Sequence, residues 1–148
     1  QAPVPENLYL SYNTFGNFEF AVPIGWTTSI SNGSFCAANT ETGSSYCVTV
    51  SKTEMTTLQE ISQIQYIQNI SKTRSNLYIK SFGASSSQIT AESIYSLQGE
   101  QMLFYHFISL EDGYLYELML DTPLSKGEED YQLFKECVKY FRVVKSNK

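Results

Sequence analysis

The chain has 148 residues, of which 42% are hydrophobic and 14% aromatic, and that length can bury about two-thirds of the unfolded surface in one core. Lys and Arg total 10 against 15 Asp and Glu, so the formal net charge is -5, the wrong sign for neutralising a phosphate backbone. These values exclude a nucleic-acid binder, a coiled coil and a disordered tail, and no apolar stretch is long enough to span a bilayer. We expect a single domain over residues 1–148, with 1–6 as an extended leader and 146–148 as a tail.

The distribution of charge favours an exported protein. Charged residues make up only 17% of the chain, whereas soluble domains average about 25%, and no Lys or Arg precedes Lys52. The chain begins at Gln1 without an initiator Met, so we expect that a signal peptide has been removed and that the protein is secreted or periplasmic. A trimmed cytosolic protein is the alternative.

The three cysteines divide into a pair and a single residue. Cys36 and Cys47 flank a polar, Gly- and Ser-rich tip, so a hairpin would bring them opposite each other and an oxidising compartment would join them in a disulfide. Two reduced thiols are the alternative. Cys137 shares helical spacing with Phe134 and Phe141, which is typical of a small buried hydrophobic residue.

The first predicted strand covers 18–22, where Phe18 and Phe20 alternate with polar residues, and it ends at Pro23. The chain then turns through Gly25 to Trp26. Val48 and Val50, after Cys47, continue a second or third strand. Trp26 lies near Tyr9, Tyr12 and Phe15 in the chain, an aromatic group more typical of a core than of a ligand cleft.

A helix is predicted over residues 58–72. Thr57 and Glu60 have capping-box spacing, and Leu58, Ile61 and Ile70 fall on one apolar stripe. The opposite face is rich in Gln and carries little charge, as an ordinary solvated face does.

Period-two patterns then predict strands over 77–82, 89–97, 102–110 and 114–121. Asp112-Gly113 between the last two is a strong hairpin signal, and a two-residue turn there would pair Ser109 with Tyr116 and Phe107 with Leu118, and in the same way Tyr105 with Leu120. Both faces of this hairpin are largely apolar. The sheet therefore needs cover on both faces.

The last predicted helix follows Ser125, which has capping-box spacing to Glu128. Glu128, Glu129 and Asp130 place negative charge on its first turn, where the helix dipole favours it, so no metal is needed to explain them. The basic residues of the later turns are likewise interpreted as a solvated face.

Motifs for the common enzyme classes are absent from the sequence. It holds one His and no GxSxG, HExxH, Walker loop or GxGxxG, so we expect no catalytic residues, no cofactor and no metal. In the hairpin register His106 lies opposite Met119 and diagonal to Glu117 and Asp121. A carboxylate-paired histidine that binds a ligand or metal weakly is one interpretation, and a histidine hydrogen-bonded under a helix is the favoured one.

Two triplets match the N-glycosylation pattern, Asn32-Gly33-Ser34 and Asn69-Ile70-Ser71. Such triplets arise by chance in Ser-rich chains, so by themselves they do not indicate glycosylation.

Two stretches resemble PsbP-like domains. FEFAVPIGW, from Phe18 to Trp26, is similar to a strand-to-turn signature near the start of these domains, and YLYELMLDTP with the later KYFRVV resembles their closing strand, helix and terminal segment. The superfamily includes the PsbP protein of photosystem II, the Ran-binding Mog protein of yeast and DcrB-type lipoproteins. The resemblance assigns Pro23, Gly25 and Trp26 as fold residues and implies an α+β fold, an antiparallel sheet of about six strands covered by helices on both faces.

The sequence as a whole predicts an exported bacterial module that binds another protein and has no chemistry of its own, acting as a monomer. Two alternatives stay open. One is a small hydrolase that uses carboxylates around His106, and the other is a carrier of a small apolar ligand between sheet and helix. A flat aromatic patch would favour the binding module, a deep cleft with convergent acids the hydrolase, and an enclosed apolar cavity the carrier.

Overall fold

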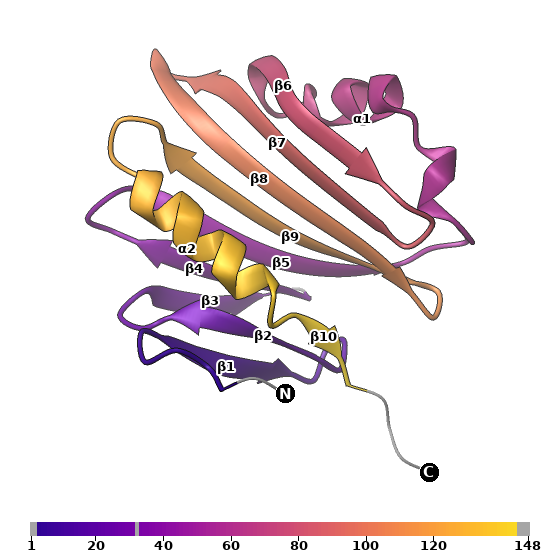
Figure 1. Ribbon diagram of the computed structural model, residues 1–148, viewed down its shortest axis with the longest axis horizontal. Coiled ribbons are helices and arrows are strands. Elements are labelled where there is room, and N and C mark those ends of the chain that lie inside the picture. Colours follow the sequence, from indigo (N-terminus) through magenta and orange to yellow (C-terminus); the bar gives the residue numbers. More distant parts are fainter. Residues whose placement is uncertain (1–2, 32, 145–148) are drawn as a thin grey trace.

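The computed structural model describes residues 3–31 and 33–144, which form two antiparallel sheets and two α-helices (Figure 1). The larger sheet has seven strands in the spatial order β3 (Thr27–Ser31), β4 (Ser34–Asn39), β5 (Ser44–Lys52), β9 (Tyr114–Pro123), β8 (Glu100–Glu111), β7 (Gln88–Leu97) and β6 (Ser75–Ala84). The smaller sheet has three, in the order β1 (Leu8–Asn13), β2 (Phe18–Pro23) and β10 (Arg142–Val143). The helices are α1 (Gln63–Ile70) and α2 (Glu128–Val138), and a 3-10 turn, η1 (Leu58–Glu60), precedes α1. Within this described part of the chain, no helix is long and apolar enough to cross a membrane.

The predicted α+β class and antiparallel sheet are confirmed, but the expected detail of about six strands covered by helices on both faces is not matched exactly. The main sheet has seven strands, and one of its faces is covered jointly by α2 and the three-stranded sheet, while η1 and α1 lie on the other face. The sequence does not predict β3, because all five of its residues are exposed and no apolar alternation marks it. It does not predict β1 either, since Tyr9, Leu10 and Tyr12 are all exposed and the strand lacks a buried face of period two.

The β8–β9 hairpin matches its prediction. Asp112 and Gly113 form the turn with positive φ angles of 51° and 81°, as a primed two-residue turn requires. The observed register pairs Ser109 with Tyr116 and Phe107 with Leu118, as predicted, and also Tyr105 with Leu120. Residues 102, 104, 106 and 108 therefore face α1, and the odd-numbered residues between them face α2.

The predicted helix over 58–72 is interrupted. Thr57 accepts a hydrogen bond from the Gln59 amide, but η1 ends at Glu60, and the backbone of the next residue, Ile61, is extended. The capping box belongs instead to Ser62 and Gln65 at the start of α1. Thr57 and Ser62 both have capping chemistry, so two short helical turns replace one long helix.

The predicted capping box of Ser125 and Glu128 is wrong. The N-cap residue of α2 is Gly127, which has no side chain to cap the helix. The Ser125 hydroxyl instead donates to Glu100 at 3.5 Å. Gly127 is required by space, because a Cβ atom there would collide with the Thr122 side chain and lie 3.0 Å from the Pro123 carbonyl oxygen. The start of α2 therefore rests directly on the end of β9.

We expect Gly127→Ala to lower the free energy of unfolding by about 2 kcal/mol, since an added methyl group at a packed contact forces the neighbours apart. Urea denaturation followed by circular dichroism measures this loss. Gly83→Ala is the matched control, because a Cβ at Gly83 meets no atom within 4 Å. Equal stability of the two variants would contradict the close contact at Gly127.

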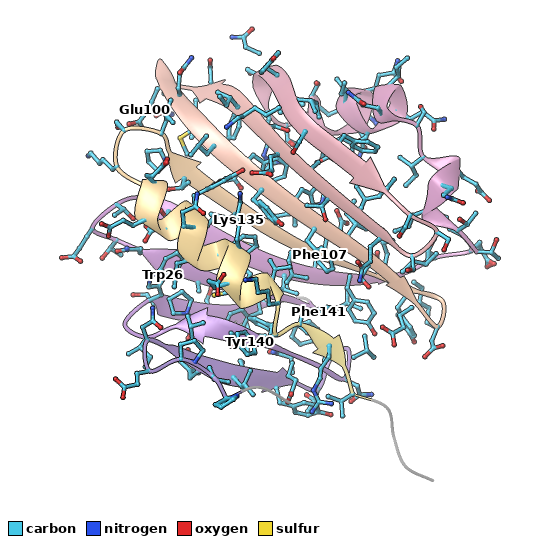
Figure 2. The ribbon with its side chains drawn as sticks, in the orientation of Figure 1. Trp26, Glu100, Phe107, Lys135, Tyr140 and Phe141 are labelled. Atoms are coloured by element: carbon cyan, nitrogen blue, oxygen red, sulfur yellow. A yellow bond between two sulfur atoms is a disulfide. The ribbon has the colours of Figure 1, made fainter. Side chains whose placement is uncertain are left out.

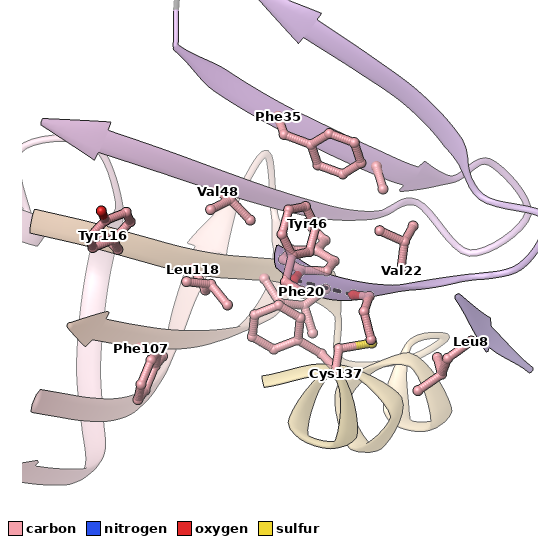
Figure 3. Close-up of a cluster of buried hydrophobic side chains, with 14 of the residues drawn as sticks. Leu8, Phe20, Val22, Phe35, Tyr46, Val48, Phe107, Tyr116, Leu118 and Cys137 are labelled. Carbon is pink, nitrogen blue, oxygen red and sulfur yellow. Dashed lines mark hydrogen bonds between the residues drawn. The ribbon is translucent and has the colours of Figure 1, made fainter. Parts of the chain in front are cut away.

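The larger core joins the two sheets and α2 (Figure 3). Phe20 of β2 is fully buried, and its ring lies 4.8 Å from that of Phe35 on β4 and 5.6 Å from that of Tyr46 on β5, centroid to centroid. Tyr46 in turn contacts Phe134 of α2 at 4.5 Å. Four elements therefore meet in one aromatic cluster.

The chain after α2 continues this packing. Phe141 lies 6.0 Å from Phe107 of β8, ring centroid to ring centroid, and 5.5 Å from Tyr116 of β9 (Figure 2). The following strand, β10, then pairs Arg142 with Glu19 and Val143 with Phe18. The C-terminal segment is thereby joined to the N-terminal sheet.

Candidate functional site

His106 lies in the middle of β8, opposite Met119, on the sheet face that α1 covers. Its side chain is only 1% exposed. The position follows from the even-numbered alternation of β8, which places it between Phe104 and Ile108. A polar ring at such a place needs internal partners, because burying an unpaired polar group costs free energy.

Both ring nitrogens of His106 have a partner. Nδ1 lies 2.7 Å from the Tyr66 hydroxyl on α1, and Nε2 lies 2.8 Å from Glu117 Oε1 on β9. The Glu117 carboxylate only accepts, so Nε2 carries the hydrogen of the neutral ring and donates to it, which leaves Nδ1 to accept from the Tyr66 hydroxyl. Burial raises the pKa of Tyr66, which keeps this hydroxyl protonated. A directed chain of hydrogen bonds thus runs from Tyr66 through His106 to Glu117 and ties α1 to the sheet.

Asp121 takes part in a separate network. Arg74 donates to both of its carboxylate oxygens, from Nε at 2.9 Å and from Nη2 at 2.8 Å, and the Tyr95 hydroxyl donates to Oδ1 at 2.6 Å. Burial opposes the charge of Arg74, but the bonds to Asp121 raise its pKa above the ordinary value. Glu117 is therefore hydrogen-bonded to His106, as the register predicts, whereas Asp121 is hydrogen-bonded to Arg74 and Tyr95.

Arg74 is a site residue that the sequence does not reveal. Its guanidinium carbon lies 3.8 Å from the centroid of the Phe104 ring, which adds a cation–π contact to the bidentate ion pair. Arg74 lies just before β6, far from Asp121 in the chain, so no local spacing signals the pair.

A pocket of about 420 Å³ opens beside His106. Residues from three parts of the chain line it: the segment before α1, α1 itself and the β8–β9 hairpin. They are Met55, Glu60, Ile61, Gln65, Tyr66, Asn69, His106, Ile108, Leu115 and Glu117. The hydrogen-bonded chain Tyr66–His106–Glu117 forms part of this lining.

The predicted disulfide between Cys36 and Cys47 is confirmed. The two residues are directly opposite each other in the β4–β5 register, as the hairpin prediction requires. The third cysteine, Cys137, is fully buried beside Tyr46 in the larger core, as expected for a small hydrophobic residue (Figure 3). Burial raises its pKa to about 12, so at neutral pH it is the uncharged thiol, which is much less nucleophilic than the thiolate.

The aromatic residues near the start of the chain do not form one group. Phe15 and Trp26 are partly buried against the larger core, whereas Tyr9 and Tyr12 are 40% and 51% exposed. The interpretation of all four as core residues is therefore wrong for the two tyrosines. Their strand, β1, is the outer strand of its sheet and has no neighbour on one side among the described residues.

The fold-motif residues Pro23, Gly25 and Trp26 form the chain segment that links β2 of the smaller sheet to β3 of the larger sheet. Pro23 ends β2, Gly25 has a positive φ of 94°, and the Trp26 amide donates to the Pro23 carbonyl at 3.4 Å. This turn carries the chain from the smaller sheet into β3 of the larger one.

The acidic start of α2 does more than complement the helix dipole. Asp130 is buried, and its carboxylate accepts hydrogen bonds from Asn39, Thr42 and Ser44 around the β4–β5 turn. These hydrogen bonds hold the start of α2 against β4 and β5. In residues 3–31 and 33–144, no three His, Cys, Asp or Glu side chains come together in a way that could hold a metal ion.

Of the two glycosylation triplets, the one at Asn69 lies on α1 with its asparagine exposed. Asn32 lies outside the described residues, as does the tail 146–148.

The architecture is that of the PsbP-like fold, which confirms the resemblance at the level of fold. In particular, the Ran-binding protein Mog1p of Saccharomyces cerevisiae superposes with a TM-score of 0.71 at 14% identity over 93% of this chain and 96% of that one. The cyanobacterial PsbP of Synechocystis, CyanoP, gives 0.70 at 15% identity over 95% and 94%. A Pseudomonas aeruginosa protein of unknown function, a putative regulator, gives 0.59 at 10% identity over 96% and 99%. No protein-family model and no curated protein matches the sequence.

Proposed function

We propose that the chain is an exported, non-catalytic accessory module of a bacterial envelope or secretome, and that it binds another protein through β1. The observation that carries this proposal is the edge of β1 that no other described residue pairs with. The strand is outermost in its sheet, its sequence LYLSYN has no charge and no Pro, and its register with β2 has no bulge. At natural sheet edges, charges, prolines or bulges normally prevent pairing with another strand, and an edge without them can accept a strand from a partner.

The side chains of β1 are also those of a binding surface. Tyr9, Leu10 and Tyr12 are 40%, 38% and 51% exposed, and Ile24, whose amide bonds to the Asn7 carbonyl beside β1, is 59% exposed. Aromatic and aliphatic side chains gathered at one edge are typical of a protein interface.

The two edge strands of the larger sheet, β6 and β3, are less suited to a partner than β1 is. β6 has two register irregularities and carries Lys80, both of which discourage strand addition. β3 is uncharged, but Ile30 is its one large exposed hydrophobic residue. We therefore assign the contact to β1 and expect the partner to supply an extended segment with apolar side chains.

Two further observations support the proposal. The Cys36–Cys47 disulfide is the kind of bond that persists in an oxidising compartment, in agreement with export. Mog1p, which shares the fold, is named for binding another protein, Ran. The polar groups that could serve a hydrolase are engaged internally, since both nitrogens of His106 are bonded.

We expect the double variant Leu10→Lys and Tyr12→Lys to lose its partner, because two charges on an edge strand oppose strand addition. Proteins that co-purify with the chain from native envelope or medium are identified by mass spectrometry, and the purified partner is then titrated with each variant. Tyr78→Lys is the matched control, since Tyr78 is 67% exposed on β6, an edge strand of the larger sheet. It should bind as the unchanged protein does.

The proposal is overturned if no partner is recovered reproducibly while the chain turns over substrates from a glycoside and ester panel. It is also overturned if Tyr78→Lys, rather than the β1 variant, abolishes binding. Thermal unfolding of each variant checks that the fold is intact.

A further inference from the structure

The pocket beside α1 has the size and lining of a small-molecule site. Its volume of about 420 Å³ falls in the range of ligand pockets, roughly 300–1,000 Å³. Apolar surface is supplied by Ile108 and Leu115 of the larger sheet and by Met55 and Ile61 of the segment before α1. The pocket lies on the opposite face of the larger sheet from β1, so it does not belong to the proposed interface.

The charge of the lining has one sign. Glu60 and Glu117 both line the pocket, and none of the described residues that line it is Lys or Arg. Arg74 interacts electrostatically with Tyr66, but its own charge is neutralised by the bidentate bond to Asp121. A ligand that enters this pocket therefore meets two glutamate side chains and no Lys or Arg among the lining residues.

The hydrogen-bonded chain fixes one of these carboxylates in place. The Nε2–H of His106 donates to Glu117 Oε1 at 2.8 Å, and the imidazole is itself held by the Tyr66 hydroxyl. Oε2 of Glu117 has no such partner among the described residues, and the Glu117 side chain is 28% exposed. A carboxylate that is oriented by a buried donor, with one oxygen left to accept, is prepared for a cationic hydrogen-bond donor.

We propose that this pocket binds a small cationic amine with an apolar body. The apolar part lies against Ile108, Leu115 and Met55, and the ammonium group donates to Glu117, with Glu60 adding negative charge at the same pocket. The binding site is independent of the partner surface at β1, so the failure of either proposal leaves the other standing.

The probe is 2-phenylethylammonium, and 2-phenylethanol, which has the same frame and no charge, is the comparison ligand. Titration of labelled protein by NMR should show the ammonium binding about tenfold more tightly than the alcohol, because a hydrogen bond between charged groups is the stronger one. The shifted resonances should include those of Ile61, Ile108 and Leu115. The affinity should fall as salt is added, since the pair is partly exposed.

Three variants test the assignment to this pocket. Glu117→Gln should bring the ammonium down to the affinity of the alcohol. Asn69→Lys places a positive charge on an exposed position of the lining and should weaken ammonium binding about fivefold by repulsion, without touching the buried chain. Glu41→Gln removes one negative charge from the exposed β4–β5 turn and should change nothing.

Equal affinity for the two ligands, shifts that map away from the pocket or no binding at all would each overturn the proposal. The proposal is also overturned if Asn69→Lys binds the ammonium with the same affinity as the unchanged protein. This second variant keeps the test valid if Glu117→Gln fails to fold.

Discussion

Replacing Phe20 by Ala is expected to lower the free energy of unfolding by about 4 kcal/mol, as truncation of a fully buried aromatic ring does. Phe20 is 0% exposed and contacts Phe18, Phe35 and Tyr46, so its loss leaves a cavity between β2, β4 and β5. The cavity forms where the smaller sheet meets the larger one. Urea denaturation measured by circular dichroism gives the difference from the unchanged protein.

The control for this prediction is Tyr78→Ala. Tyr78 is 67% exposed on β6, so its truncation should change the free energy of unfolding by no more than about 0.5 kcal/mol. A loss below about 1 kcal/mol for Phe20→Ala would show that the two sheets are not joined through this ring.

Removal of the disulfide, as Cys36→Ala with Cys47→Ala, should cost about 3 kcal/mol. The bond closes a short loop across the β4–β5 turn, with a sequence separation of 11 residues, and the unfolded chain gains that freedom when the bond is absent. The measurement is again denaturation, with and without a thiol reductant. Addition of reductant should destabilise the unchanged protein and leave the variant as it is.

Because Cys137 is fully buried and present in both proteins, it does not account for a difference between them. An unchanged protein that is insensitive to reductant, or a variant as stable as the unchanged protein, would contradict the prediction.

Local patterns in the sequence predict the parts of this fold whose neighbours in space are also neighbours in the chain. Asp112-Gly113 fixes the turn type, so the register of β8 with β9 and the position of His106 beside Glu117 follow from counting outward. The Cys36–Cys47 hairpin follows in the same way.

The rest depends on contacts between distant segments. The hydrogen-bond partners of Asp121 are Arg74 and Tyr95, and those of Asp130 lie around the β4–β5 turn. No spacing in the sequence predicts either set of partners. The division of the 58–72 helix has a similar cause. The Leu58 amide donates to the Ser86 carbonyl at 2.7 Å, so η1 is tied to the β6–β7 turn, and α1 begins afresh at Ser62.

The smaller sheet also determines how the molecule would respond to mechanical tension. β2 pairs with β1 on one side and with β10 on the other, and both pairs are antiparallel. Leu8 lies opposite Pro23 at one end of β2, whereas Val143 lies opposite Phe18 at the other end. A force that pulls residue 8 and residue 143 apart therefore acts along the strands and loads their hydrogen bonds together, as in shear, instead of opening them one after another.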